Sequence, residues 1–493
     1  PRFDNTYNQG DPVITPNFDN LAAEGVVFNN AIVASPICSP NRATLMTGLY
    51  PVTHKLVDNK DYQNFTYDNQ TIAEVLKQNG YDTGHIGKWH IAISKKKDVF
   101  FDSPKAKRGF GYWYGSPTSN HTHFDAKLYH HSNEIDGLGE YTKNSKGLPN
   151  PFVPSKDYKS IELRKQESWN PDHLTRKALD YLKNTFEVRD TNKPFALYVS
   201  YNPPHTIHGP KPKLGDIPSY NIQGKLKDET YYGYRDSREE DYDYVAPLKY
   251  EKQYRDGNSY DSPVKMSLRK RPNVPINHYS QYKCLPGYYG AINAIDACFG
   301  ELDEYLTETP DPRYPEKTLK QTTIVVVTAD HGEMMGSQNH MTKGVPFEES
   351  IGIPLIIRWP DNIPSNKEEN SVFSTVDIAP SLLGLLNIKF SNSIDGKDRH
   401  NLFLGNKEII NNNYAFVGLR NWRAVRTENE IFIVENLKKQ KTLKFTYFNL
   451  KDDPFEMKPL IYKSYGTMPY KIKKLYTILK THLVSINDSG INL

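Results

Sequence analysis

Cysteine is scarce in this chain of 493 residues, which contains only Cys38, Cys284 and Cys298. Three cysteines cannot build a disulfide framework, and the spacing of Cys284 and Cys298 leaves open whether they pair. No apolar run approaches the roughly 20 residues that a membrane-spanning helix needs. Lys and Arg number 62 and Asp and Glu 58, so the net charge is only +4. The composition therefore indicates a globular protein with no membrane span, and it gives no support to nucleic acid as a partner.

Strand-like and helix-like segments alternate along the first three quarters of the chain. Phe195–Ser200 and the β-branched run Thr323–Thr328 are typical of buried strands. Helical patterns cover Thr71–Asn79, His173–Thr185 and Tyr289–Leu306. This alternation predicts an α/β fold with a mostly parallel central sheet and helices on both faces.

The pattern changes toward the C-terminus. Asn421–Arg426, Glu430–Glu435 and Lys444–Asn449 are typical of short paired strands, and Lys471–Ile486 of a closing helix. We therefore expect a small antiparallel sheet with a helix in this part of the chain.

These patterns predict two domains. Residues 1–405 would form a catalytic α/β domain, and residues 406–493 a C-terminal α+β subdomain. Residues 211–275 are rich in Tyr, Asp, Arg and Lys and have little apolar periodicity. We interpret them as a long loop excursion from the first domain and as a determinant of substrate choice.

The first chemically informative motif is Cys38-Ser-Pro-Asn-Arg42, which runs on to Thr-Gly48. Ser39 suits an N-cap, Pro40 the first helical position and Gly48 the stop of a short helix. Cys38 would then lie at a helix N-terminus, which favours negative charge on a nucleophile. Seen alone, a single cysteine beside a helix cap is more often a buried structural residue.

A second motif is Gly80-Tyr-Asp-Thr-Gly-His-Ile-Gly-Lys88-Trp-His90. In an extended chain, Lys88 and His90 project in the same direction because they lie two residues apart. An ammonium and an imidazole together suit a tetrahedral oxyanion, although the same residues also suit a polar surface turn.

Two further clusters directly follow predicted strands. Asn202-Pro-Pro-His205 follows one, and Asp330-His331-Gly332 follows the other, with Lys343 thirteen residues beyond Asp330. Ligands of open α/β sheets bind beyond the carboxyl ends of the strands. We therefore expect these clusters to meet at one sheet edge, where an Asp and a His suit a divalent cation.

Together these motifs resemble the type I, formylglycine-dependent sulfatase family of the alkaline phosphatase superfamily. The resemblance rests on Cys-x-Pro-x-Arg at Cys38–Arg42 and on Gly-Tyr-x-Thr followed by Gly-Lys-x-His over 80–90. It continues through the clusters around His205 and Asp330 to Asn449-Leu-Lys-Asp-Asp-Pro454, and so covers nearly the whole chain.

The resemblance implies a nucleophile and a metal site. A separate maturation enzyme would oxidise Cys38 to formylglycine, whose hydrated aldehyde attacks sulfur, and Arg42 would hold that hydrate. Asp330 and His331 would bind Ca²⁺ together with the formylglycine oxygen at position 38.

The resemblance also implies a clamp for the sulfate group. Four residues would bind the sulfate oxygens and serve proton transfer: Lys88, His90, His205 and Lys343. The family also has an Asp-Asp pair on a strand that should lie just before Pro1–Asp4, and it is absent here. We expect that the chain lacks this first strand, and that without upstream residues it is inactive and binds calcium poorly.

The expected function is hydrolysis of sulfate esters, with a sulfated carbohydrate as substrate. Trp113, His121 and His123 are candidates for sugar contacts, although ordinary loop packing explains them equally well. Two alternatives stay open: a phosphonate or phosphodiester hydrolase of the same superfamily, and an inactive sulfatase-fold protein that binds glycans. The family implies a secreted, periplasmic or lysosomal location.

Overall fold

The computed structural model describes ten stretches of the chain: residues 13–61, 64–91, 107–116, 129–132, 170–185, 187–205, 272–274, 285–406, 413–437 and 443–488. Of the loop excursion predicted over 211–275, only residues 272–274 are among them, and His121 and His123 lie outside the described residues. The described helices include none that is long and apolar enough to cross a membrane.

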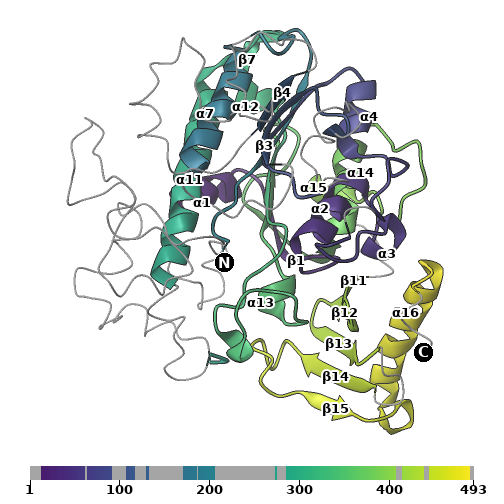
Figure 1. The fold of residues 1–493 in the computed structure, drawn as a ribbon. Helices are drawn as coiled ribbons and strands as arrows, with labels where there is room; N and C mark the ends of the chain where they lie inside the picture. Colours follow the sequence, from purple (N-terminus) through teal and green to yellow (C-terminus); the bar gives the residue numbers. More distant parts are fainter. Residues whose placement is uncertain are drawn as a thin grey trace, which may run out of the picture.

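Two four-stranded sheets form the centre of the fold (Figure 1). One has the order β10-β1-β9-β8, in which β1 is parallel to β10 and antiparallel to β9, and β9 is antiparallel to β8. The other has the order β4-β3-β2-β5, in which β2 is parallel to both neighbours and β4 is antiparallel. The strands are β1 (Val26–Ile32), β2 (Asp82–Lys88), β3 (Tyr112–Ser116), β4 (Tyr129–Ser132), β5 (Phe195–Ser200), β8 (Val325–Thr328), β9 (Leu355–Arg358) and β10 (Lys367–Ser374).

Helices cover both faces of these sheets, which confirms the predicted fold class. The sheet around β2 is mostly parallel, as predicted, whereas the sheet around β1 is mixed. Figure 1 shows α7 and α11 along one side, and α2, α4 and α14 along the other. The helices are α1 (Pro16–Ala23), α2 (Cys38–Thr47), α3 (Pro51–His54), α4 (Ile72–Gln78), α7 (Asn170–Lys183), α11 (Leu285–Glu308), α12 (Leu319–Thr322), α13 (Glu348–Ile351), α14 (Thr375–Leu385), α15 (His400–Phe403) and α16 (Tyr470–Ser485), with 3-10 turns η4 (Ser337–Asn339) and η6 (Tyr465–Thr467) and a hairpin of β6 (Pro310–Asp311) and β7 (Tyr314–Thr318).

Strand periodicity divides the core into layers. In β3, Tyr112 and Tyr114 pack against α7, whereas Trp113 between them packs with residues of α2 on the opposite face. In β9, Ile356 faces α1 and α11, and Ile357 faces the C-terminal part of the chain. Successive side chains of a strand point to opposite faces of the sheet. Both faces are covered by other elements, so side chains on both are apolar.

The C-terminal strands form an antiparallel sheet, as predicted, in the order β11-β12-β13-β14-β15. Phe432 and Val434 pack under α16, whereas Ile431 and Ile433 pack toward the first central sheet. Its strands are β11 (Tyr414–Leu419), β12 (Trp422–Thr427), β13 (Glu430–Glu435), β14 (Lys444–Asn449) and β15 (Leu460–Tyr462). The proposed domain boundary at 405/406 stays a prediction.

Candidate active site

The helix α2 carries Cys38 at its first position and ends at Gly48, whose left-handed φ of 65° terminates it as predicted. The start differs from the prediction by two residues, because Ile37 is the N-cap and Ser39 already lies inside the helix. A backbone amide that has no partner within the helix is satisfied from another loop: Ser39 N donates to Asn59 Oδ1 at 2.9 Å. Asn59 therefore takes the capping role that the sequence suggested for Ser39.

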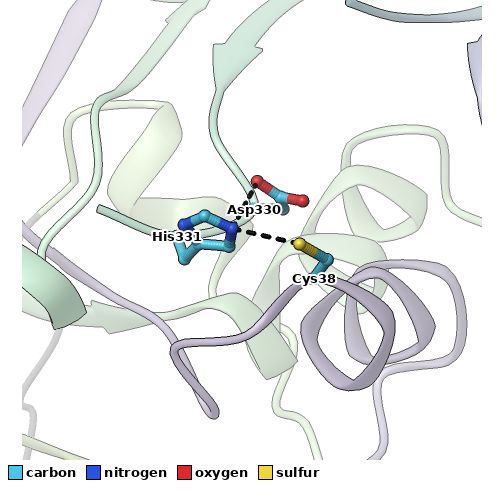
Figure 2. Close-up of side chains that lie close together, drawn as sticks. All are labelled: Cys38, Asp330 and His331. Atoms are coloured by element: carbon cyan, nitrogen blue, oxygen red, sulfur yellow. Dashed lines mark hydrogen bonds and ion pairs between the residues drawn. The ribbon is translucent and has the colours of Figure 1, made fainter. Parts of the chain in front are cut away.

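Cys38 is buried, and Figure 2 shows its sulfur beside the side chains of Asp330 and His331. His331 Nε2 lies 3.3 Å from Sγ, and Lys88 Nζ lies 3.9 Å from it. Asp330 Oδ1 lies 3.7 Å from His331 Nε2. Donor atoms of Cys38, Asp330 and His331 all fall within 4.8 Å of one another, which is the spacing of ligands around a metal ion.

Arg42 is held by three hydrogen bonds one turn into α2. Its Nε donates to Asp330 Oδ2 at 2.7 Å, and its Nη1 donates to Ser200 Oγ at 2.7 Å and to the Lys88 carbonyl at 2.8 Å. Burial alone would raise the pKa of Asp330, but the positive charges of Arg42 and His331 hold it well below its usual range. The carboxylate is therefore ionised at neutral pH and available to a cation.

His331 has a defined orientation and an altered basicity. Its Nδ1 lies 2.8 Å from the Gly332 carbonyl, so Nδ1 carries a proton and donates it, while Nε2 points toward Cys38. Burial acts to lower the pKa of His331, but the neighbouring Asp330 carboxylate and Cys38 raise it above its ordinary value.

Asn41 joins the nucleophile helix to two other elements, a role that the sequence did not reveal. Its Nδ2 donates to the Asp330 carbonyl at 2.8 Å. Its Oδ1 accepts from Thr375 Oγ1 at 2.7 Å, and that hydroxyl accepts from Ala34 N at 3.0 Å. This buried chain fixes the backbone of Asp330 relative to α2 and α14.

His54, also missed from the sequence, holds the first turn of α2 from the side. Its Nε2 lies 3.1 Å from the Pro40 carbonyl and 3.2 Å from Thr44 Oγ1, and its Nδ1 accepts from Leu56 N at 3.2 Å. The ring is fully buried, and burial lowers its pKa to about 3. It is therefore a neutral imidazole whose proton sits on Nε2.

Lys88 and His90 both reach the site, but by a different route from the one predicted. Gly87 has φ 103° and His90 has φ 60°, so the chain leaves the extended conformation around Lys88. Burial lowers the pKa of Lys88 to about 8. Burial also lowers that of His90 to about 4, although a hydrogen bond with Cys38 opposes the shift.

His205 and Lys343 meet on the opposite side of the site. Lys343 Nζ lies 2.5 Å from His205 Nε2, and the His205 ring centroid lies 6.4 Å from that of His331. Burial, with Lys343 and Lys88 adding to it, lowers the pKa of His205 to about 4. The C-terminal sheet contacts the segment that carries Lys343, because Trp422 Nε1 donates to the carbonyl of the next residue, Gly344, at 3.2 Å.

The structure thus gathers all six predicted catalytic residues into one site, together with Asp330 and His331, which were predicted to bind the metal along with position 38. The expectation for Trp113 needs correction. Its side chain is fully buried in the core and stacks on His85, with ring centroids 5.4 Å apart, so no sugar can reach it. The sequence misled here because an aromatic residue of a buried strand cannot be told from a surface aromatic by its identity alone.

Comparison with known families agrees with this site. Residues 2–388 match the sulfatase family, and residues 336–486 match the C-terminal region of N-sulphoglucosamine sulphohydrolase. The first match spans more than half of the chain, so the chain belongs to the sulfatase family, which consists of sulfuric ester hydrolases and falls within the alkaline phosphatase superfamily. The predicted family and enzyme class are thereby confirmed.

Two curated relatives are similar over most of the chain. An endo-4-O-sulfatase from Bacteroides thetaiotaomicron is 28% identical over 424 residues, which cover 82% of this chain and 68% of that protein. A ulvan-active sulfatase from Formosa agariphila is 31% identical over 396 residues, which cover 79% of this chain and 60% of that protein.

Solved structures share the fold. A protein in complex with its substrate D-glucosamine-2-N,6-O-disulfate matches with a TM-score of 0.64 and 22% identity, covering 97% of this chain and 94% of that one. A phosphonate monoester hydrolase from Silicibacter pomeroyi matches with a TM-score of 0.59 and 17% identity, covering 98% of this chain and 92% of that one. The fold by itself therefore does not decide which ester is cleaved.

Proposed function

We propose that this protein hydrolyses sulfate esters of a sulfated carbohydrate, with a formylglycine made from Cys38 as its nucleophile and Ca²⁺ as its metal. One observation carries the proposal: the Cys38 sulfur is buried at the start of α2 in contact with His331 and Lys88. The names of the two relatives support a glycan substrate, since one is an endo-4-O-sulfatase and the other acts on ulvan.

The donor set fits a divalent cation in part. Asp330 offers an ionised carboxylate and His331 an imidazole, next to the position where formylglycine would supply an oxygen in place of sulfur. Calcium takes about six to eight ligands, mostly oxygens, so these residues form one side of its site. The formylglycine hydrate would supply a nucleophilic oxygen, and a cation bound by Asp330 and His331 would stabilise negative charge on that oxygen.

The cationic side chains would receive the sulfate group. Lys88 and Lys343 approach from two sides, and Arg42 is fixed by Asp330, Ser200 and the Lys88 carbonyl. Such fixed charges stabilise negative charge that develops on the sulfate oxygens, and they need little reorganisation during the reaction. Burial strengthens each of these interactions because little water screens them.

His90 and His205 would transfer protons. Both imidazoles are neutral at neutral pH in the free protein, because burial lowers the pKa of each to about 4. A bound sulfate ester brings negative charge and raises both pKa values. One ring can then donate a proton to the leaving alkoxide while the other accepts one from the nucleophilic hydroxyl.

The test is sulfate release by the protein, expressed together with the upstream strand that the family resemblance predicts and with a formylglycine-forming maturation enzyme. We expect turnover of an aryl sulfate that chelation of calcium abolishes, and slower turnover of the matching aryl phosphonate. Mass spectrometry of the peptide containing Cys38 should show CH₂SH replaced by CHO. Faster cleavage of the phosphonate, or full sulfate release by protein whose cysteine is unmodified, contradicts the proposal.

A location outside the cytosol remains a prediction.

A further inference from the structure

Positive charge is concentrated in one part of the C-terminal subdomain. Residues 457–487 contain six lysines and no Asp or Glu. The chain as a whole carries +4, so the remaining residues sum to 4 − 6 = −2. Four of these lysines lie on α16, one lies on the connection between β15 and α16, and one lies just before β15.

Aromatic side chains lie among these lysines. Lys473 Nζ lies 5.2 Å above the centre of the Tyr465 ring and 3.4 Å from the Gly466 carbonyl oxygen. The Tyr465 ring in turn lies 5.0 Å from that of Tyr476, centre to centre. The connection between β15 and α16 is therefore held against the first turns of the helix, with the ammonium group at its edge.

Three residues of the first turn of α16 share one face with this contact. Tyr470, Lys473 and Lys474 are spaced i, i+3 and i+4, so their side chains are neighbours on the helix surface. The opposite face is buried through Ile472, Leu475, Leu479 and Leu483. Lys463, Tyr465, Tyr470, Lys473 and Lys474 are called the basic end below.

The basic end is open to solvent. Tyr470 is 85% exposed and Tyr465 is 45% exposed. Lys463 and Lys474 are exposed as well. Lys471 is left out because it forms an ion pair with Glu430. Packing does not explain Tyr470, since a solvated helix face needs only polar residues.

We propose that the basic end binds an anionic, sulfated polysaccharide chain at a second site, separate from the active site. The tyrosine rings offer flat apolar surfaces with a polar edge, which suit the faces of sugar rings, and the lysines pair with sulfate groups. Figure 1 shows the start of α16 beside β15, at the end of the molecule away from α2. The inference rests on the proposed function, because it takes the bound chain to be of the same class as the substrate.

Such a site retains a polymer near the enzyme between cleavage events. Attachment of one stretch of a chain raises the effective concentration of its other sulfate groups at the active site. The site therefore lowers KM for a long substrate and leaves kcat unchanged, and it has no effect on a small aryl sulfate.

The test compares two matched triple variants of the full chain. Tyr470→Ala/Lys473→Ala/Lys474→Ala removes the three residues of the basic end that lie on α16. Tyr314→Ala/Lys317→Ala/Lys389→Ala removes one exposed tyrosine and two exposed lysines elsewhere on the surface. The probe is fluorescent dextran sulfate, with uncharged dextran as its reference, and its affinity is measured by anisotropy at low salt.

We expect the basic-end variant to bind dextran sulfate at least about tenfold more weakly and the matched variant to bind within about twofold of the parent protein. Equal weakening in both variants, or none in the first, overturns the inference. Each protein is also assayed on an aryl sulfate. Loss of that turnover in the parent protein counts against the proposed function alone, because the binding comparison does not depend on catalysis.

Discussion

Two regions of this protein gather positive charge, and they do so in opposite ways. In the active site Lys88 is 3% exposed and Arg42 is 7% exposed, and both contact protein groups. At the basic end, Tyr470 and Lys474 face solvent. Buried charges interact strongly and have fixed positions, whereas exposed charges are screened and adaptable. The first arrangement suits a single sulfate group, and the second suits a flexible chain that carries many.

The buried arrangement also needs more support. Arg42 depends on the hydrogen bonds that it donates to Ser200, the Lys88 carbonyl and the Asp330 carboxylate. It also depends on the Asn41 and His54 contacts that position α2. A substitution in this network therefore alters both catalysis and stability. A substitution at the basic end should alter neither.

The largest expected effect is that of Cys38→Ala in the matured protein. It removes the side chain from which the nucleophile is made, and we expect turnover of an aryl sulfate to fall by about 10³-fold or more. The measurement is kcat/KM for both proteins from the same co-expression. The thermal midpoint should change little, because alanine keeps most of the apolar contacts. A variant that retains a tenth of the activity would show that another group attacks sulfur.

Next in size is Arg42→Lys, which keeps the charge but loses the forked geometry. Lysine cannot bond Asp330, Ser200 and the Lys88 carbonyl together, so two of three hydrogen bonds are lost. We expect a loss of about 2 kcal/mol of stability and about 100-fold in kcat/KM.

The matched control for that change is Arg420→Lys. Arg420 pairs with Asp58 at 2.7 Å, but its side chain is 62% exposed. An exposed ion pair contributes about 0–1 kcal/mol, so the control should change the free energy of unfolding in urea very little. Equal destabilisation by both changes would mean that burial does not set the strength of the Arg42 contacts.

Several strands and the nucleophile motif could be predicted from the sequence, because they depend on residues that are close together in the chain. The strands Phe195–Ser200, Glu430–Glu435 and Lys444–Asn449 occur with the expected bounds, because each is a short β-branched or aromatic run between polar residues. Cys38 and Arg42 were identifiable because their motif is specific.

The remaining parts of the site depend on contacts between distant segments. Asn59 caps α2 from 20 residues away, and Thr375 reaches Asn41 across 334 positions. A single polar residue carries no sign of such a distant partner, so neither contact could be assigned from the sequence. The prediction for Trp113 was wrong because its side chain packs in a core formed by several distant segments, and the sequence does not show that these segments meet.

A smaller effect is expected for His54→Gln, and it depends on pH. The folded pKa of about 3 lies below the ordinary value of 6.5, so the unfolded chain binds a proton that the folded protein excludes. The contribution of His54 to stability is therefore complete above pH 6.5 and is lost as pH falls toward 3. At pH 5 the difference amounts to about 2 kcal/mol.

Glutamine does not titrate, so it removes this pH dependence while it retains an amide donor for the Pro40 carbonyl. At pH 7 the variant should be less stable by about 1 kcal/mol for a lost hydrogen bond. At pH 5 the gap should close or reverse, as measured by urea unfolding at both values. His340→Gln, which changes an exposed ring, serves as the control and should not shift the comparison. A gap of constant size would show that folding does not lower the pKa of the His54 ring.

The smallest expected effect is that of salt on a small substrate, and it separates the two regions without any substitution. Raising the ionic strength from about 0.05 M to 0.5 M shortens the screening length from about 14 Å to about 4 Å. The exposed lysines of the basic end then lose most of their attraction, so KM for a sulfated polymer should rise about tenfold. Lys88 and Arg42 are shielded from solvent, so KM for an aryl sulfate should change by about twofold at most. Equal salt dependence for both substrates would mean that the polymer is held by the active site alone.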